Sequence, residues 1–212
     1  MPKISIRKHH DAELHGGSLS AHCLPDADFF LYGFLKPVGH AGTGSSPAAG
    51  RFGLPYQTEL TDHDGRAFKL EEQCGRVVLV SMMYNSCTFV CPMLVDTMGL
   101  TRDTLTEKER TQLDALLITF DPARDDMKSL KSVLEKRALD PAHWRLARTD
   151  AASTRKIAAV LGIQYRLLPD GEYNHTTVLI LLDTEGRILG RTRKIGAVDP
   201  VFFRLVRQTL TN

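Results

Sequence analysis

The fold and the chemistry of this chain are both centred on one segment, Val77-Val-Leu-Val-Ser-Met-Met83-Tyr-Asn-Ser-Cys87-Thr-Phe-Val-Cys91-Pro92. Its first part is almost wholly apolar, which is typical of a buried β-strand. Pro92 suits the first turn of a helix, because the N–H that proline lacks would have no partner there. We therefore expect both cysteines to lie in the loop and first turn between a strand and a helix.

This placement favours chemistry at Cys87 and Cys91. A helix N-terminus stabilises negative charge, so it favours the thiolate over the thiol. Two cysteines at such a place can form a disulfide or chelate a soft metal ion, and we expect them to lie close enough for a disulfide. The alternative is plain core packing, since cysteine is a common core residue. The proline directly after the second cysteine favours the reactive pair.

Composition limits the function classes. The chain has 212 residues, of which 42% are hydrophobic and 25% charged, as expected for one globular domain with extensions. A net charge of +2 provides no electrostatic basis for binding nucleic acid. The apolar runs are far shorter than the ~20 residues of a membrane-spanning helix. The N-terminus lacks the apolar stretch of a secretory signal, so no leader or anchor is visible in the sequence.

Residues 1–55 are predicted to be an N-terminal extension and flexible linker, and residues 56–212 to be the folded domain. The linker prediction rests on the glycine-, serine- and alanine-rich stretch Gly39–Gly50. The first fifty residues also hold five of the eight histidines: His9, His10, His15, His22 and His40. A solvated arm is favoured over a metal site for these histidines.

From residue 56 onward, strands alternate with helices. We expect a hairpin at 58–70, strands at 77–84, 113–120, 144–148, 178–183 and 187–195, and helices at 92–105, 125–138, 151–161 and 199–210. This order predicts an α/β fold, a central sheet with helices on both faces. A cysteine motif between the first core strand and its helix is found in thioredoxin-like folds. Cys74, just ahead of that strand, is expected to be a packed or idle thiol.

His175 is the remaining histidine placed for chemistry, because it follows a polar loop and precedes the buried strand at 178–183. A lone histidine in a loop is usually just exposed to solvent. Its position alone therefore does not assign it to a site.

Three separated motifs together resemble the Sco/SenC family: Cys87-Thr-Phe-Val-Cys91-Pro92, Asp121-Pro-Ala-Arg-Asp125 and His175-Thr-Thr-Val…Leu-Leu-Asp183. The resemblance covers about residues 56–210 and implies a thioredoxin-like fold of the peroxiredoxin-like variant. It also implies an extracytoplasmic, periplasmic and membrane-associated location. Two features depart from the family pattern: Thr88 stands where many members have proline, and the usual membrane anchor is not seen.

The resemblance further implies that Cys87, Cys91 and His175 are copper ligands, and that Cys87 and Cys91 are also a redox-active pair. Two thiolates and one imidazole suit three-coordinate Cu(I), or Cu(II) with a further ligand, whereas structural zinc takes four ligands. The implied function is delivery of copper to the dinuclear site of cytochrome c oxidase, reduction of the cysteines of that site, or both. The implied partners are subunit II of the oxidase or another copper protein, and a copper donor or thiol reductant.

Two other functions compete with copper delivery. A general thiol–disulfide oxidoreductase remains open, although the spacing here is Cys-x-x-x-Cys rather than Cys-x-x-Cys and no proline directly precedes Val178. A thiol peroxidase is disfavoured, because the loop lacks the Pro-x-x-x-Thr-x-x-Cys pattern of peroxiredoxins. Copper delivery ranks first and the dithiol reductase second.

Overall fold

The computed structural model describes Pro55 and residues 57–211, so the predicted extension over residues 1–55 lies almost wholly outside the described residues. The described elements run in this order: β1 (Glu59–Asp62), β2 (Ala67–Lys69), the short 3-10 helix η2 (Leu70–Gln73), β3 (Val77–Met83), α1 (Val90–Asp103), α2 (Glu107–Arg110), β4 (Leu113–Thr119), α3 (Met127–Lys136), β5 (Trp144–Arg148), α4 (Ala151–Leu161), β6 (Tyr165–Leu167), β7 (Tyr173–His175), β8 (Leu179–Leu182), β9 (Ile188–Thr192) and α5 (Pro200–Thr211).

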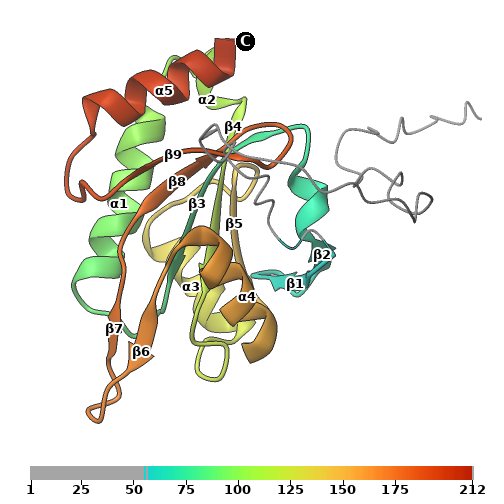
Figure 1. The fold of residues 1–212 in the computed structure, drawn as a ribbon, viewed down its shortest axis with the longest axis vertical. Coiled ribbons are helices and arrows are strands. Elements are labelled where there is room, and N and C mark those ends of the chain that lie inside the picture. The colour runs from blue at the N-terminus through green and yellow to red at the C-terminus, as the bar shows by residue number, and fades with distance from the viewer. Residues whose placement is uncertain (1–54, 56, 212) are drawn as a thin grey trace, which may run out of the picture.

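The centre of the molecule is a mixed sheet with the strand order β2-β1-β5-β4-β3-β8-β9 (Figure 1). Its middle strands β3, β4 and β5 are parallel, and the outer strands pair antiparallel to their neighbours. Every residue of β3 is buried. A strand covered on both faces needs such a continuous apolar run, so the expected α/β fold is confirmed.

Helices cover both faces of the sheet. The crossovers from β3 to β4 and from β4 to β5 run in the same direction across the sheet, and right-handed crossovers then place α1 and α3 on the same face. An ion pair between Asp96 of α1 and Arg137 at the end of α3 joins these two helices. Helix α4 lies on the other face, in front of the strands in Figure 1.

Local signals explain where several helices begin and end. Asp150 accepts hydrogen bonds from the N–H groups of Ala152 and Ser153 at the start of α4, and Gly162, with φ of +68°, ends that helix. Thr106 and Glu109 form the capping box of α2, each side chain accepting the other residue's N–H. The caps of α4 explain why the sequence predicts its bounds correctly, at residues 151–161.

Three sequence-based expectations are wrong in detail. Helix α1 begins at Val90 rather than Pro92, and proline is tolerated there because the first turn leaves its N–H groups unpaired. The polar loop before His175 contains a hairpin, β6–β7, which turns at Gly171 with φ of +87°. Cys74 is disulfide-bonded rather than a packed or idle thiol.

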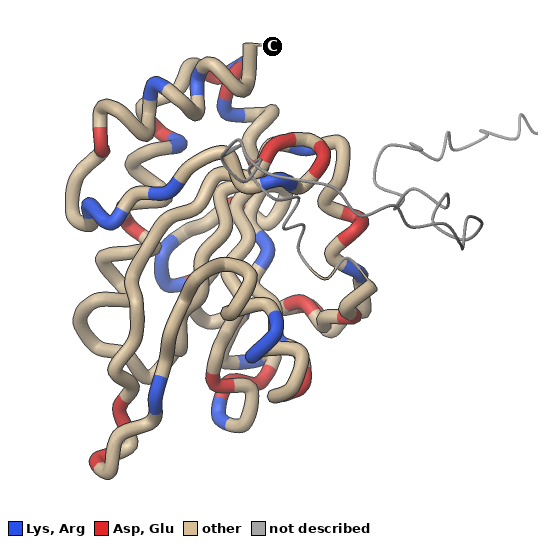
Figure 2. Tube along the Cα trace, viewed as in Figure 1, with Lys and Arg blue, Asp and Glu red and all other residues tan. Residues whose placement is uncertain are grey.

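Basic and acidic residues are interspersed along the described elements (Figure 2), so neither sign dominates a large region in that view. Among the described residues, no helix has both the length and the apolar character needed to cross a membrane.

Candidate metal centre

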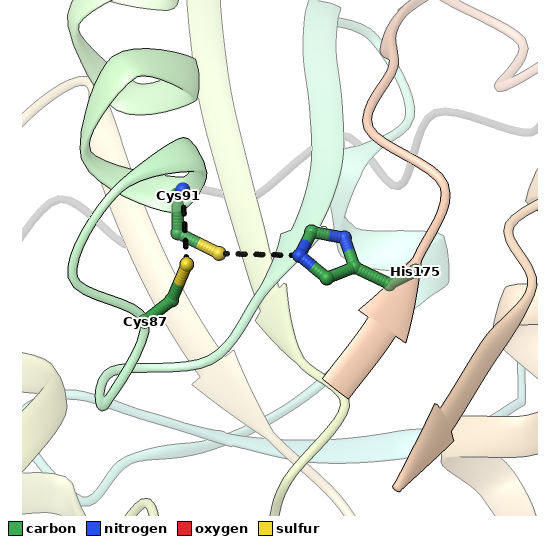
Figure 3. Close-up of side chains that lie close together, drawn as sticks. All are labelled: Cys87, Cys91 and His175. Carbon is green, nitrogen blue, oxygen red and sulfur yellow. Dashed lines mark hydrogen bonds between the residues drawn. The ribbon is translucent and has the colours of Figure 1, made fainter. Parts of the chain in front are cut away.

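The two cysteines lie where β3 gives way to α1. Cys87 is in the loop, and Cys91 is in the first turn of the helix, as the sequence predicts. Both are free thiols, and both side chains are buried. The N–H of Cys91 donates a hydrogen bond to Sγ of Cys87 at 3.3 Å, which is drawn in Figure 3. The helix N-terminus therefore points one of its unpaired N–H groups at the first sulfur.

His175 approaches this pair from the opposite direction. It is the last residue of β7, a short distance before β8, and β8 pairs antiparallel with β3. The chain that leads into β8 therefore lies at the edge of the sheet where β3 ends. Nε2 of His175 is 3.9 Å from Sγ of Cys91 (Figure 3). The sequence placed this histidine in a loop, and the structure places it at the end of a strand.

The neighbours of His175 determine which ring nitrogen is free. Nδ1 lies 3.2 Å from the carbonyl oxygen of Thr176, which can only accept a hydrogen bond. The proton is therefore assigned to Nδ1, and Nε2 presents its lone pair toward the sulfurs. Burial lowers the pKa of His175, more than its bond to Thr176 raises it. The ring is thus neutral at pH 7, as a metal ligand must be.

The ligand atoms of Cys87, Cys91 and His175 all lie within 4.8 Å of one another. In the described part of the chain, this is the one group of three or more histidine, cysteine or carboxylate side chains compact enough to hold a metal ion. The donors are two soft sulfurs and one imidazole nitrogen. Such a set fits a soft, low-coordinate ion such as Cu(I) and lacks the fourth ligand of a structural zinc site.

The two thiols differ in acidity. Burial alone would raise the pKa of Cys87, but hydrogen bonds from the backbone N–H groups of Cys91 and Phe89, and from the Cys91 side chain, lower it below its usual value. Burial raises the pKa of Cys91, and the neighbouring Cys87 and Asp125 raise it further. Cys87 is therefore the more acidic thiol of the pair, and Cys91 keeps its proton at neutral pH until a metal or a disulfide replaces it.

This difference predicts the order of alkylation in the reduced, metal-free protein. The thiolate is the reactive form, so a lowered pKa makes Cys87 react with iodoacetamide at a lower pH than an ordinary thiol. Cys91 should react more slowly at every pH below 9. Peptide mass spectrometry across a pH series measures both rates, and the same experiment in denaturant should bring them together. Faster alkylation of Cys91 would contradict the assignment.

Aromatic rings hold the histidine in place. The ring of His175 meets Tyr84 edge-on at 5.7 Å and Phe120 at 5.0 Å between centroids. The Tyr84 hydroxyl donates to Oε2 of Glu172 at 2.5 Å, which ties the β6–β7 hairpin to the end of β3. Sequence reasoning missed Tyr84 and Glu172, whose only signal was their nearness in the chain to Cys87 and His175.

Asp125 supports the cysteine loop from the side of β4. Its buried carboxylate accepts hydrogen bonds from the N–H of Asn85 at 3.0 Å and the hydroxyl of Thr119 at 2.5 Å. The strands β3 and β4 are parallel, so their carboxyl ends meet at the same edge of the sheet. The Asp-Pro-x-x-Asp motif found in the sequence thus fixes the start of the loop that carries Cys87.

A cavity of about 500 Å³ leads from the surface to the two sulfurs. It lies between α1 and α3, and its walls include Cys87, Cys91, Pro92, Val133 and Lys136. A larger cavity, of about 650 Å³, lies near the other end of α1 and does not reach the cysteines.

The fold and the site define a thioredoxin-like protein with a dithiol at a helix N-terminus and a histidine beside it. The sequence model of the SCO1/SenC family matches residues 45–207, and the chain belongs to this family. The family resemblance that the three motifs indicated is therefore confirmed.

Known relatives agree with this assignment. The chain is similar to the mitochondrial protein SCO1 of Saccharomyces cerevisiae, with 28% identity over 142 residues that make up 65% of this chain and 47% of the yeast protein. It thus spans about half the length of that relative.

Solved structures are similar as well. ScoI of Bradyrhizobium japonicum, solved with copper bound, is 25% identical with a TM-score of 0.60, covering 71% of this chain and 96% of that one. ScoI of Arabidopsis thaliana, also solved with copper bound, has a TM-score of 0.64 at 17% identity, covering 76% of this chain and 99% of that one, and this likeness supports the fold alone.

Proposed function

We propose that this chain binds one copper ion through Cys87, Cys91 and His175 and delivers it to the dinuclear copper site of cytochrome c oxidase. The observation that carries the proposal is the compact group of two sulfurs and one imidazole nitrogen within 4.8 Å. Membership of the SCO1/SenC family and the copper-bound relative from Bradyrhizobium japonicum support copper as the ion. Copper is the cargo here rather than a resident cofactor.

The donor set suits a cargo site. Two thiolates hold Cu(I) firmly, and the imidazole adds a third, borderline ligand. A three-coordinate ion leaves room for an incoming ligand from an acceptor, so the metal can move by stepwise exchange. The cavity between α1 and α3 reaches the sulfurs and provides a path for that ligand.

The same dithiol supports a second role, the reduction of a disulfide in the acceptor. The Cys87 thiolate attacks one sulfur of the partner disulfide and displaces the other as a thiolate. The Cys91 sulfur, losing its proton, then attacks Cys87 and releases the second partner thiol. The chain is left with a Cys87–Cys91 disulfide, and two electrons have passed to the partner. The low pKa of Cys87 and the raised pKa of Cys91 favour this order.

A general thiol–disulfide oxidoreductase without a copper role is the alternative function. The unequal acidity of the two thiols favours it, because an acidic attacking thiol beside a buried partner is what disulfide exchange needs. The placement of His175 Nε2 beside the sulfurs favours copper, since disulfide exchange does not require a metal-facing nitrogen at that position.

We further propose an extracytoplasmic, membrane-associated location, and as partners subunit II of cytochrome c oxidase, a copper donor and a thiol reductant. The disulfide-bonded Cys74 supports an oxidising compartment. Membership of the SCO1/SenC family supports the partners.

Copper transfer between purified proteins tests the proposed function. The reduced chain is loaded with one equivalent of Cu(I), desalted and mixed with the soluble, copper-free domain of subunit II. We expect the chain to retain the copper through desalting and then to pass it to the domain, as followed by metal analysis after separation. A reduced chain that retains no copper but readily reduces a model disulfide would support the oxidoreductase instead.

A further inference from the structure

Phe89 is a large apolar residue that the fold leaves in solvent. It lies between the two cysteines, and it is 75% exposed, the most exposed of the large hydrophobic residues in the described part of the chain. Its neighbours on the same loop, Cys87 and Cys91, are only 9% and 2% exposed. The loop therefore buries its sulfurs and presents an aromatic ring.

Phenylalanine at residue 89 does not favour the stability of the fold. Phe89 is the N-cap of α1, with φ of −124° and ψ of −70°, and its side chain makes no cap hydrogen bond. Serine, threonine, aspartate or asparagine is strongly preferred at an N-cap, because its side chain can bond an unpaired N–H of the first turn. Phenylalanine provides neither that bond nor buried apolar area here. Folding thus does not account for Phe89.

Copper transfer requires an acceptor to reach the two sulfurs on either side of Phe89. An acceptor sulfur can take the metal only by bonding to it while Cys87 or Cys91 still holds it. Both sulfurs are buried, and the cavity between α1 and α3, which both cysteines line, gives an acceptor a route to them. A segment that enters there contacts Cys87, which lies two residues before Phe89 on the same loop.

The charges around the cavity indicate what such a segment should contain. Asp96 and Arg137 on its walls pair with each other. Lys136 also lines the cavity, and the described part of the chain provides no salt-bridge partner for it. An acidic group on the acceptor would therefore complement this wall.

We propose that Phe89 is the aromatic anchor by which this chain docks its copper acceptor, a protein that inserts a thiol-bearing loop with an acidic group into the cavity between α1 and α3. An apolar pocket on the acceptor covers the Phe89 ring, and the acidic group lies beside Lys136. Each acceptor thiolate that bonds to copper displaces one sulfur of this chain, and the displaced sulfur takes up a proton. Copper remains Cu(I), so no electrons are exchanged. The inference rests on the proposed function.

Two exposed residues make a matched test. Phe89→Ser removes the anchor and restores a side chain able to cap α1, so it should not lower the thermal stability of the protein. Val201→Ser removes an apolar residue that is 70% exposed on α5 and serves as the control. The probe is the soluble, copper-free domain of cytochrome c oxidase subunit II. Calorimetry measures its affinity for each variant, both without copper and after loading with one Cu(I).

We expect Phe89→Ser to bind copper as the wild type does, since it keeps both cysteines, His175 and the backbone N–H at position 89. Its affinity for the domain should fall about tenfold or more, as for an aromatic interface anchor, and copper transfer should slow accordingly. Val201→Ser should match the wild type in its affinity for the domain and in its rate of copper transfer. Equal affinity of Phe89→Ser and wild type would overturn the docking role.

The design separates this inference from the proposed function. If wild-type protein forms no complex with the domain, the docking proposal is wrong, whatever happens to copper. If the complex forms and depends on Phe89 but copper does not move, the docking role stands and the delivery function fails.

Discussion

The His175→Ala variant should lose Cu(II) binding while keeping its dithiol chemistry. The imidazole is the ligand that matters most to Cu(II), whereas two thiolates can hold Cu(I) in linear geometry. We expect Cu(II) affinity to fall by more than about 100-fold, because even changes to residues that only orient metal ligands cost 10–100-fold. Cu(I) affinity should fall less. The dithiol should still oxidise to a disulfide, since His175 contributes no sulfur.

A copper titration followed by visible absorption, with a thiol count before and after oxidation, measures these effects together. The thiolate-to-Cu(II) charge-transfer band of the wild type should disappear in the variant. His143→Ala is the control, because His143 is bonded to Asp114 near the start of β4, at the end of the sheet opposite the cysteines. Unchanged Cu(II) spectra in His175→Ala would show that His175 is an ordinary histidine at the end of β7.

Cys87→Ser and Cys91→Ser should each abolish both activities. A serine hydroxyl is close in size to the thiol but stays protonated and is a poor ligand for copper. A single remaining sulfur cannot close a disulfide. Both variants should therefore lose copper on desalting and show no intramolecular oxidation. Retention of one copper per chain by either variant would contradict the site.

The two serine variants should nevertheless differ from each other. Cys91→Ser keeps the acidic Cys87 thiol and should accumulate a mixed disulfide with a partner or with glutathione. Cys87→Ser keeps only the buried thiol, whose pKa is raised, and should form such adducts slowly. Intact-mass measurement after incubation with oxidised glutathione gives both rates. The reverse order would contradict the roles assigned to the two cysteines.

The local part of the fold could be predicted from the sequence. The apolar run of β3, the proline after Cys91, and Asp150 and Gly162 at the ends of α4 are signals that act within a few residues. The first two correctly placed the strand, the loop and the helix that carry the two cysteines, and the last two correctly placed the ends of α4. The start of α1 differed by two residues, because Pro92 is tolerated anywhere in the first turn.

Contacts between residues far apart in the sequence could be established only from the structure. The proximity of His175 to the cysteines depends on the pairing of β8 with β3, which joins residues about a hundred positions apart, and the sequence suggested it only through the family resemblance. The hairpin β6–β7 was missed because its strands are three residues long and contain no fully buried residue, which is too little for an alternating pattern to be recognised. The solvent exposure of the Phe89 side chain could not be predicted either, since a phenylalanine is more often buried.

The central claim is that copper is held by Cys87, Cys91 and His175. X-ray absorption at the copper edge, on the reduced chain loaded with one Cu(I), tests it most directly. We predict a first shell of two sulfurs and one nitrogen, and loss of both sulfurs in the Cys87→Ser, Cys91→Ser double variant. A shell of nitrogen and oxygen alone in the wild type would contradict the claim and assign the copper to other residues, such as the histidines within residues 1–50.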